Sequence, residues 1–556
     1  MFKTSFILRV FNCVLFITIS ISSIGQSNNK LLAPTPPMGW NSWNAFEVNI
    51  NEAKIKQIAD AMVSTGMRDV GYKYLVLDDA WMAAERDSLG NLTADPKKFP
   101  GGMKAIGDYI HSKGLKFGIY ECRGYLTCQK LPGSFQHEQA DMNSFALWGV
   151  DYIKLDACYA EKNGRLSTED FIIYSNCIKK TGRQMLLSIS DFGMGAWAWG
   201  GKNYAQMWRT SFDIYPNMES VYEHANSSGG TGSIHPAFNG LWQFAGPGYW
   251  NDPDLLEVGN LKNEIEDKAH FSLWSILAAP LMTSNDLRSM SDTTRKIITA
   301  PEIIAVNQDA RGHQGFKITQ RDSTEVYAKP LSDGTVAVLL LNKGTSSQKI
   351  KVNWSKLGLR GKQKVRDLWQ QKDIGVFENS FSSNNLSKDE VLFIKVGTPG
   401  SSPVPGPLPL APDKYTITKG GTTYLSDLFY IMKSGETPVY NKSFTQHPIF
   451  INGKKYHKGL GCKSKTQIMF KLDGKASRLK ADIGLDDSYA GQETGIFTIY
   501  NEDFFGNKVL FDSKKMNKKS KTISVDIDVK GLKFILLEFS GNDVMGNWGN
   551  IRVEGL

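Results

Sequence analysis

The stretch that decides the fold reads Asp151-Tyr-Ile-Lys-Leu-Asp-Ala-Cys158. Its apolar residues predict a short buried strand over residues 152–155, which delivers Asp156 at its C-terminal end. Lys154 precedes this aspartate by two residues, and side chains two apart on a strand point the same way. We therefore expect the lysine to share a wall with the carboxylate and to hold the pKa of Asp156 low. An ionised carboxylate at a strand end suits a nucleophile that attacks a glycosidic carbon. A structural salt bridge is the alternative.

Strand-like and helical patterns alternate around this stretch, over residues 31–315. Amphipathic patterns predict helices over residues 52–65 and 102–113, and Gly114 stops the second. Alternation of this kind predicts an α/β fold, the (β/α)8 barrel. The eight expected strands cover residues 38–43, 74–78, 116–120, 152–156, 185–190, 207–213, 248–252 and 277–282.

Polar side chains gather at one end of these expected strands. Those at or just past the C-terminal ends are Asp78, Asp79, Tyr120, Asp156, Asp213 and Asp252. In (β/α)8 barrels this rim carries the active site. Structural salt bridges would be expected at both ends of the strands, so the one-sided distribution favours a functional cluster.

The pattern changes after the barrel, and a chain of 556 residues is expected to hold several domains. Period-two alternation over residues 316–396 predicts an antiparallel β-sandwich. Residues 397–412 are rich in Pro, Gly and Ser and predict an exposed linker. Residues 413–556 predict a second β-sandwich module built from short strands.

The N-terminus predicts export. Lys3 and Arg9 precede an apolar run over residues 10–24, and small residues follow, which is typical of a secretory signal over residues 1–25. The run is short for a membrane span, and no later stretch could span a membrane. We expect a protein exported to the periplasm or secreted.

Five cysteines follow the expected signal, so at least one is not paired within the chain. Cys128 and Cys158 follow neighbouring expected strands and are the best candidates for a disulfide, which an exported protein can hold. None of the cysteines has the spacing of a zinc site. The net charge of +9 is modest for this length, and the scattered lysines favour a solvated surface over a nucleic-acid site.

Two adjacent carboxylates, Asp78 and Asp79, end the second expected strand. They repel each other unless hydroxyl groups or cations occupy them. Sugar hydroxyls form strong charge-assisted hydrogen bonds with carboxylates, whereas Ca²⁺ or Mg²⁺ is the alternative occupant. Trp40, Trp43 and Trp81 lie alongside as stacking faces, which favours the sugar, and core packing is the alternative for at least one of them.

Asp213 follows the sixth expected strand and faces the same rim as Asp156. Two carboxylates across a sugar can divide the work, one attacking the anomeric carbon and the other protonating the leaving oxygen. Arg209 is expected to bind a sugar hydroxyl or to orient Asp156. Asp252 and Asp254, which end the seventh strand, are expected to brace the rim.

Taken together, these motifs resemble glycoside hydrolase family 27, the α-galactosidase and α-N-acetylgalactosaminidase family, over residues 31–396. The matching motifs are Pro36-Pro-Met-Gly-Trp-Asn-Ser-Trp43, Leu77-Asp-Asp-Ala-Trp-Met82, His111-Ser-Lys-Gly-Leu-Lys116, Gly118-Ile-Tyr120, Tyr152-Ile-Lys-Leu-Asp-Ala-Cys158, Gly246-Pro-Gly-Tyr-Trp-Asn-Asp-Pro-Asp254 and Ser284-Asn-Asp-Leu-Arg288. The resemblance implies a retaining enzyme that needs no metal or other cofactor and works through a covalent glycosyl-enzyme.

The resemblance also implies roles for single residues. It makes Asp156 the nucleophile and Asp213 the general acid/base, and it assigns the galactose 4- and 6-hydroxyls to Asp78 and Asp79. The other implied substrate-binding residues are Trp43 and Tyr120, which shape the pocket, Lys154 on the nucleophile side, Arg209 by the 2-position, Ser190 and Asp252. Cys128 and Cys158 look like the disulfide of the family.

One departure concerns the segment Ser188-Ile-Ser-Asp-Phe-Gly193, where galactosidases commonly show Cys-Glu-Trp near the sugar 2-hydroxyl. Ser190 stands where a glutamate is common, and Gly193 replaces a bulkier residue. Smaller groups resemble the N-acetylgalactosaminidase branch, which fits an acetamide at C2. Alternatively, Asp191 replaces the missing acid.

The last module resembles NPCBM, a β-sandwich found beside glycosidases, and this resemblance implies glycan binding. The residues that carry it are Tyr424-Leu-Ser-Asp-Leu428, Ile451-Asn-Gly453, Tyr456-His-Lys-Gly-Leu-Gly461, Ala481-Asp-Ile-Gly-Leu-Asp-Asp487 and Trp548. The usual Gly-Ile-Gly-Thr-His is here Gly459-Leu-Gly-Cys-Lys463. Asp486 and Asp487 are either ligand contacts or turn formers.

The leading hypothesis is a retaining exo-α-galactosidase that acts on carbohydrates with terminal α-galactose. An α-N-acetylgalactosaminidase is the first alternative and a β-L-arabinopyranosidase the second, which the Asp78-Asp79 pair disfavours because it suits a C6 hydroxymethyl group. A glycan-binding protein without activity is the alternative from another class, and the presence of both candidate catalytic carboxylates argues against it.

Overall fold

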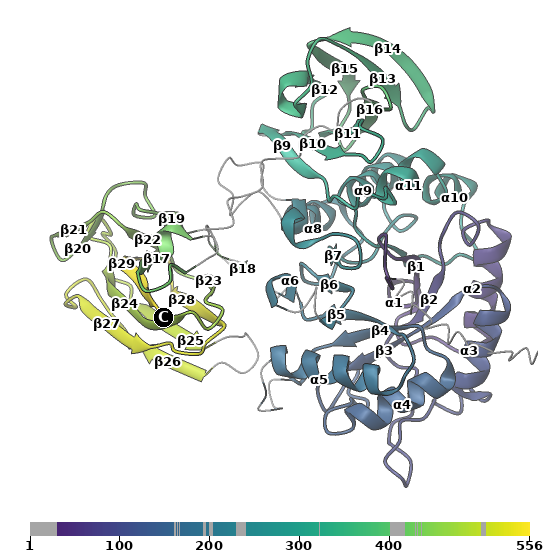
Figure 1. Cartoon of the computed structure of the whole chain (residues 1–556), viewed down its shortest axis with the longest axis horizontal. Helices are drawn as coiled ribbons and strands as arrows, with labels where there is room; N and C mark the ends of the chain where they lie inside the picture. Colours follow the sequence, from purple (N-terminus) through teal and green to yellow (C-terminus); the bar gives the residue numbers. More distant parts are fainter. Residues whose placement is uncertain are drawn as a thin grey trace, which may run out of the picture. The chain divides into compact units, whose positions relative to one another are not determined.

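The computed structural model describes residues 31–160, 163, 165, 167–192, 196–199, 204–229, 241–321, 323–400, 417–428, 430, 432–434, 436, 438–501 and 508–556 (Figure 1). The expected signal over residues 1–25, Gly193 and most of the expected linker lie outside these described residues.

Eight parallel strands among the described residues form one curled sheet, in the order β7-β6-β5-β4-β3-β2-β1-β8. They are β1 (Met38–Asn41), β2 (Tyr74–Leu77), β3 (Lys116–Cys122), β4 (Tyr152–Asp156), β5 (Leu186–Ser190), β6 (Met207–Arg209), β7 (Trp250–Asp252) and β8 (Leu281–Thr283). Leu256, four residues beyond β7, forms a parallel bridge with Thr283 and joins the two ends of the sheet. The predicted barrel fold is confirmed.

Helices follow most of the strands, and Figure 1 shows several of them packed around the sheet. They are α1 (Trp43–Phe46), α2 (Glu52–Ser64), α3 (Gly102–Ser112), α4 (Glu138–Trp148), α5 (Ser167–Lys180), α6 (Ala196–Trp199), α8 (Met218–Gly229), α9 (Glu264–Ile276), α10 (Asp292–Ile298) and α11 (Pro301–Asn307). Helix α2 begins where the Asn51 side chain accepts a hydrogen bond from the Lys54 N–H, 2.9 Å away. Its apolar face, with Ile55, Ile58 and Met62 fully buried, packs into the barrel core.

Alternate residues of β4 point to opposite faces of the sheet. Ile153 and Leu155 belong to the large core cluster, which also holds the buried faces of the helices. Tyr152 belongs instead to a small cluster with Tyr74, Val76, Leu186, Met207 and Trp250, contributed by neighbouring strands. Lys154 and Asp156 share the direction of Tyr152, because side chains two apart on a strand point the same way. Strand parity therefore separates these two polar side chains from the helix-covered face.

Several strand limits differ from the predictions: β3 runs on to Cys122, β7 begins at Trp250 and β8 begins at Leu281. Two of the differences move candidate site residues out of a strand. Strand β6 ends at Arg209 and not at Asp213, which places Asp213 in the loop that follows. Strand β1 ends at Asn41, and Trp43 begins helix α1 because the Asn41 side chain accepts a hydrogen bond from the Trp43 N–H. In both places side chain-to-backbone contacts end the sheet ladder before the apolar pattern ends.

The following segment forms antiparallel sheets, one with the order β14-β13-β16-β11-β10-β9 and a second that pairs β12 with β15. Its strands are β9 (Phe316–Arg321), β10 (Thr324–Pro330), β11 (Val336–Asn342), β12 (Gln348–Asn353), β13 (Lys362–Asp367), β14 (Lys372–Glu378), β15 (Ser380–Leu386) and β16 (Val391–Val396). The buried side chains of both sheets meet in one apolar cluster around Trp354, as in a β-sandwich.

The last segment is also antiparallel, with main sheets ordered β19-β22-β29-β24-β27 and β18-β23-β28-β25-β26. Its strands are β17 (Thr422–Tyr424), β18 (Met432–Ser434), β19 (Val439–Tyr440), β20 (Ile449–Ile451), β21 (Lys454–Tyr456), β22 (Gly459–Lys463), β23 (Thr466–Lys471), β24 (Ala476–Leu485), β25 (Gly495–Asn501), β26 (Lys508–Asp512), β27 (Ile523–Asp528), β28 (Phe534–Gly541) and β29 (Met545–Gly555). Trp548 and Phe497 pack edge to face in its own apolar core. No helix in the described part of the chain has both the length and the apolar surface that a bilayer crossing requires.

Candidate active site

A cavity of about 400 Å³ opens at the C-terminal ends of the barrel strands. Its lining residues are Trp43, Asn44, Glu47, Asp78, Asp79, Tyr120, Cys128, Lys154, Asp156, Arg209, Asp213, Ile214, Tyr215, Pro216, Asp254, Leu255, Glu257 and Asn260. Among the described residues, Trp43 is the one tryptophan in this lining, whereas Trp40 and Trp81 are fully buried in the core. The cavity therefore gathers side chains from strand ends that lie far apart in the sequence.

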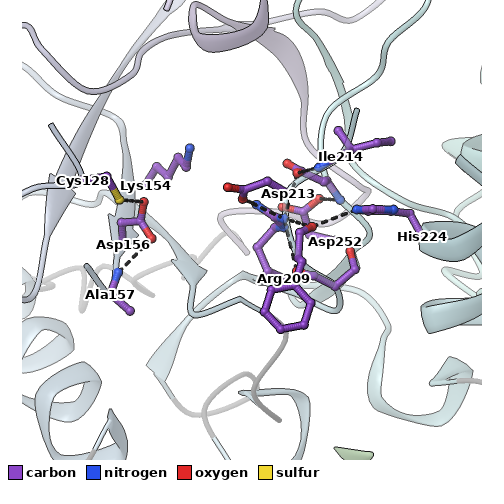
Figure 2. Close-up of polar contacts among 12 residues, drawn as sticks. Cys128, Lys154, Asp156, Ala157, Arg209, Asp213, Ile214, His224 and Asp252 are labelled. Atoms are coloured by element: carbon purple, nitrogen blue, oxygen red, sulfur yellow. Dashed lines mark hydrogen bonds and ion pairs between the residues drawn. The ribbon is translucent and has the colours of Figure 1, made fainter. Parts of the chain in front are cut away.

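Asp156 ends β4 and is nearly buried, with 6% of its surface exposed. Its Oδ1 accepts a hydrogen bond from the Ala157 N–H at 2.8 Å, and its Oδ2 lies 3.5 Å from the Cys128 sulfur (Figure 2). Burial raises the pKa of Asp156 to about 6, although Lys154 and the Ala157 N–H both act to lower it. The expectation of a low pKa is wrong, because the loss of hydration outweighs the nearby cation.

Lys154 makes its ion pair with a different carboxylate from the one expected. Its Nζ lies 2.7 Å from Asp78 Oδ2, the oxygen that also accepts from the Asn41 side-chain amide at 2.7 Å. The ammonium also sits over the Tyr120 ring, 5.4 Å from its centre. Asp78 and Asp156 both act to raise the pKa of Lys154, against the effect of burial. The lysine thus remains charged between two acidic strand ends.

Asp79 follows Asp78 and is held by backbone donors. Its Oδ1 accepts from the Ala80 N–H at 2.6 Å, and its Oδ2 accepts from the Gln129 N–H at 3.0 Å. Burial raises the pKa of Asp79, and these two donors act against that effect. Ala80 adopts a φ of 69°, a left-handed conformation that costs energy for any residue except glycine. The strained turn places the successive carboxylates of Asp78 and Asp79 in the lining of one cavity.

Asp213 lies in the loop after β6, and 64% of its side chain is exposed. Arg209, at the end of β6, is buried and places its guanidinium 3.3 Å from Asp213 Oδ1 (Figure 2). The same guanidinium lies 2.8 Å from Asp254 Oδ2. Asp254 Oδ2 also accepts from the Ile214 N–H at 2.9 Å. This set of contacts fixes the loop that carries Asp213 against the end of β7.

Two predicted substrate-binding residues are buried outside the cavity lining. Ser190 ends β5 as the Cα partner of Asp156, and Asp252 ends β7, where its Oδ1 accepts from the Asp254 N–H at 2.9 Å. Burial raises the pKa of Asp252 to about 6, whereas Arg209 lowers it. Asp191 is fully buried and also absent from the lining. The suggestion that Gly193 opens the pocket falls outside the described residues.

The predicted disulfide between Cys128 and Cys158 is present, with Cα atoms 5.2 Å apart. It ties the loop after β3 to the residues after β4, next to Asp156. Cys128 and Cys158 also form the cluster with Asp156 that could resemble a metal site, but disulfide sulfurs are not thiolate ligands.

The structure adds cavity residues that the sequence did not single out as substrate contacts: Asn44, Glu47, Cys128, Ile214, Tyr215, Pro216, Asp254, Leu255, Glu257 and Asn260. Glu257 is fully buried, and burial raises its pKa to about 7, although hydrogen bonds from Asn260 and Asn44 lower it. Asp254 adopts a φ of 93°, and this strain is a signal that only coordinates provide. Asp254 was expected to brace the rim, and it does so while facing the cavity.

Comparison with known proteins gives family matches for three segments of the chain. Residues 35–309 match a family described as alpha galactosidase A, residues 321–396 match the alpha galactosidase C-terminal beta sandwich domain, and residues 421–554 match the NPCBM/NEW2 domain. Alpha-galactosidase A of Cellvibrio japonicus is 43% identical over 384 residues, which span 69% of this chain and 94% of that protein. The alpha-galactosidase of Cyamopsis tetragonoloba is 43% identical over 356 residues, or 63% of this chain and 84% of that protein.

Solved structures of alpha-galactosidases superpose on the same part of the chain. The crystal structure of alpha-galactosidase I from Mortierella vinacea superposes with a TM-score of 0.62 at 34% identity and covers 68% of this chain and 100% of its own. The Saccharomyces cerevisiae enzyme gives a TM-score of 0.60 at 26% identity, over 66% of this chain and 98% of its own. With the carboxylate-lined cavity at the strand ends and these relatives on both counts, the chain belongs to glycoside hydrolase family 27, the α-galactosidase family.

Proposed function

We propose that this protein is a retaining exo-α-galactosidase, which removes terminal α-linked galactose from oligo- or polysaccharides by double displacement. The observation that carries the proposal is the contrast between two carboxylates in one cavity. Asp156 is nearly buried at the end of β4, while Asp213 is 64% exposed on the loop after β6. A buried carboxylate suits direct attack, and an exposed one can exchange protons with water between the two steps.

In the first step, Oδ2 of Asp156 attacks the anomeric carbon, while Oδ1 stays bound to the Ala157 N–H. The bond between that carbon and the leaving oxygen breaks, and Asp213 gives its proton to this oxygen. In the second step, Asp213 takes a proton from water, whose oxygen attacks the same carbon and releases Asp156. Two inversions return the α-configuration.

Asp78 and Asp79 supply acceptors for the galactose hydroxyls in this proposal. Lys154 pairs with Asp78 at 2.7 Å, and the Gln129 N–H fixes the rotation of Asp79. Carboxylates held in this way accept strong hydrogen bonds without the cost of ordering them on binding. Trp43 and Tyr120 complete the wall around the sugar.

Chemical rescue tests the two assignments separately. With an aryl α-galactoside, Asp156→Gly should lose turnover and, with added azide, should form β-galactosyl azide by a single displacement. Asp213→Ala should instead form α-galactosyl azide, because azide attacks the glycosyl-enzyme from the other face. Proton NMR of the wild-type reaction should show the α-anomer as first product. A β-anomer first product, or azide products with exchanged configurations, would overturn the mechanism.

We also propose that the protein is exported and that its C-terminal module binds a glycan. The charged and apolar pattern of residues 1–25 supports a cleaved signal and a periplasmic or secreted protein. The disulfide between Cys128 and Cys158 suits an oxidising compartment. The match of residues 421–554 to the NPCBM/NEW2 domain supports a module that holds the enzyme on a glycan.

A further inference from the structure

His224 on α8 contacts the loop that carries Asp213, and no step of the proposed reaction uses it. The residue is buried, with 4% of its surface exposed, and its ring points toward this loop (Figure 2). Its Nε2 lies 2.8 Å from the carbonyl oxygen of Phe212, and its Nδ1 lies 2.6 Å from the carbonyl oxygen of Ser220. Both ring nitrogens therefore face an acceptor at hydrogen-bond distance.

The two acceptors decide the charge of the His224 ring. A carbonyl oxygen cannot donate, so each contact requires a proton on the ring nitrogen. A neutral imidazole carries one N–H and would turn the lone pair of its other nitrogen toward a carbonyl oxygen, whereas the imidazolium donates from both nitrogens. The Ser220 hydroxyl lies 3.5 Å from Nδ1, a far weaker contact than the carbonyl oxygen at 2.6 Å. The geometry therefore requires the imidazolium.

A second buried histidine has the opposite arrangement. His270 on α9 accepts a hydrogen bond at its Nε2 from the Glu257 N–H, 2.9 Å away, so this nitrogen carries no proton. Burial lowers the pKa of His270 to about 3, and the positive charge of His224 acts in the same direction. His270 is therefore neutral, and the charge of the two rings belongs to His224.

The charged groups beside the imidazolium offset its cost. Arg209 donates from its Nη2 to the same Phe212 carbonyl oxygen, which brings a second cation to this acceptor. Three carboxylates surround the guanidinium and act to raise the pKa of Arg209, and they belong to Asp213, Asp252 and Asp254. Their negative charge reduces the repulsion between the two cations. Two charged donors thus hold one carbonyl oxygen.

The position of this carbonyl oxygen links it to the general acid/base. It lies in the peptide plane that joins Phe212 to Asp213. Among the described residues, Arg209 is the one side chain that contacts the Asp213 carboxylate, at 3.3 Å. The backbone on either side therefore sets where this carboxylate lies. The Ile214 N–H donates to Asp254 Oδ2 at 2.9 Å on one side, and the imidazolium holds the other side.

We propose that His224, as an imidazolium, is a positioning residue for the general acid/base. It fixes the peptide bond that precedes Asp213, and the Asp213 carboxyl thereby meets the leaving oxygen. Asp213 performs the proton transfer, while His224 lies outside the cavity lining and acts through the Phe212 carbonyl oxygen. The inference rests on the role of Asp213 in the proposed function and adds a residue to its machinery.

Two leaving groups with different needs for a proton test this role. Methyl α-galactoside releases an alkoxide that must be protonated, whereas 2,4-dinitrophenyl α-galactoside releases a stable anion without an acid. His224→Phe keeps a ring and removes both donors. It should lower the ratio of kcat/KM on the methyl substrate to kcat/KM on the dinitrophenyl substrate by about 10- to 100-fold, because a misplaced acid loses much of its effect. An unchanged ratio, or an equal loss on both substrates, would overturn the positioning role.

Tyr222→Phe is the matched control on the same helix. The Tyr222 hydroxyl donates to Asp389 Oδ1 at 2.6 Å, in the segment between β15 and β16. This variant also removes a hydrogen bond of α8, but it leaves both donors to the Phe212 carbonyl oxygen in place. The ratio should therefore stay at its wild-type value. A fall equal to that of His224→Phe would mean that any weakening of α8 produces the effect, and the positioning role would be lost.

Neutron crystallography of the wild-type protein reads the charge directly. At the pH of highest activity, deuterium should occupy both Nδ1 and Nε2 of His224, but only Nδ1 of His270, whose Nε2 accepts a hydrogen bond. A single deuterium on the His224 ring would overturn the imidazolium.

Asp213→Ala separates a failure of this inference from a failure of the proposed function. This variant removes the acid itself and should lower the same ratio at least as much as His224→Phe. If Asp213→Ala leaves the ratio unchanged, the general acid of the proposed function is wrong. If Asp213→Ala lowers the ratio and His224→Phe does not, the proposed function stands and the positioning role of His224 fails.

Discussion

The ionisation of Asp156 illustrates how one residue depends on its surroundings. Lys154 lies two residues away along β4, yet its short ion pair is with Asp78, which directly follows β2 and stands 76 positions earlier in the sequence. Asp156 is left with one backbone donor and little water, and its pKa rises to about 6. Lys154 thus acts to lower the pKa of Asp156, the nucleophile candidate, but makes its short ion pair elsewhere.

This arrangement predicts the acid limb of the activity. A nucleophile must be ionised, so kcat/KM should fall as the pH drops below about 6, the pKa of Asp156. Lys154→Met removes the cation that lowers this pKa, and the limb should move to higher pH by about one unit. The measurement is kcat/KM on an aryl α-galactoside between pH 4 and 8, with Lys104→Met, an exposed lysine on α3, as the control. A limb that stays in place in Lys154→Met would contradict this account.

Substrate choice at C2 is also decided by single residues. Ser190 is 2% exposed and lies outside the cavity lining, so its small size does not by itself make room for an acetamide. We expect kcat/KM on an aryl α-galactoside to exceed that on the matching α-N-acetylgalactosaminide by about 100-fold or more, the scale on which a packed site rejects extra bulk. Side-by-side kinetics decide the question, and a preference for the acetamide sugar would overturn the leading hypothesis.

At the scale of elements, the loop after β3 reaches the cavity through two attachments. The disulfide joins Cys128 to Cys158 across 30 positions, and the Gln129 N–H next to it binds Asp79. The loop thereby connects the ends of β2 and β4. The disulfide holds the loop in place, and the Gln129 N–H on that loop orients the Asp79 carboxylate. Both attachments are therefore needed to fix the geometry of Asp79 relative to Asp156.

Loss of this disulfide should therefore reduce both stability and activity. Closing a loop of this length stabilises the fold by about 3.6 kcal/mol in the chain-entropy account. Cys128→Ser with Cys158→Ser should lower the free energy of unfolding by about that amount and lower kcat/KM, because Asp79 loses a fixed donor. Urea denaturation with and without reductant measures the first effect. Cys177→Ser, at a buried thiol outside the disulfide, is the control and should keep the sensitivity to reductant.

Lys329 on strand β10 is a second residue whose pKa is changed by burial, and this change has a measurable effect on stability. Lys329 is fully buried, and its Nζ donates to the backbone oxygens of Val306 and Asn307 at the end of α11. The acceptors at a helix C-terminus favour the ammonium, but removal from water outweighs them and lowers the pKa of Lys329 to about 7.

The sign of the resulting pH dependence follows from proton counting. Between pH 7 and about 10, the unfolded chain binds a proton at this lysine that the folded chain does not, so folding stability gains with rising pH. From pH 7 to 9 the gain should be on the order of 2 kcal/mol. Lys329→Met should remove this part of the pH dependence in urea denaturation. If the variant keeps the same slope as the wild type, the lysine is charged when buried.

At the scale of the whole molecule, three large apolar cores belong to three different parts of the chain. The barrel builds the cavity, the segment β9–β16 has its own core around Trp354, and the C-terminal module has a third core around Trp548. The cavity lining contains no residue beyond position 260 within the described chain. We therefore expect chemistry on a small substrate to need none of the C-terminal module.

Removal of the module should separate catalysis from attachment. A chain that ends at residue 400 should keep kcat/KM on an aryl α-galactoside within about twofold, because its cavity lining is intact. It should lose retention on an insoluble galactose-bearing polysaccharide, measured by a pull-down with the full chain as control. Equal retention of both chains would mean that the module does not hold the glycan.

The fold class and much of the cavity were accessible from the sequence, because they depend on local periodicity. Strand parity places Lys154 and Asp156 on one side of β4, and both line the cavity. The same reasoning misplaced the end of β6, since the contacts of Arg209 with the loop end the strand before the apolar pattern does. Ser190 and Asp252 also end strands, but neighbouring side chains cover them.

The sequence by itself determined the order of strands and helices and the one-sided placement of the carboxylates, since period and spacing are properties of the chain. It named Cys128 and Cys158 only as the best candidates for a disulfide. Only the tertiary structure decided that Lys154 pairs with Asp78, that Asp254 and not Asp252 lines the cavity, and that Tyr215 stands at its mouth. Ion-pair partners and burial depend on distances between segments remote in the chain. Those distances are set when the barrel closes, and with them the pKa of Asp156.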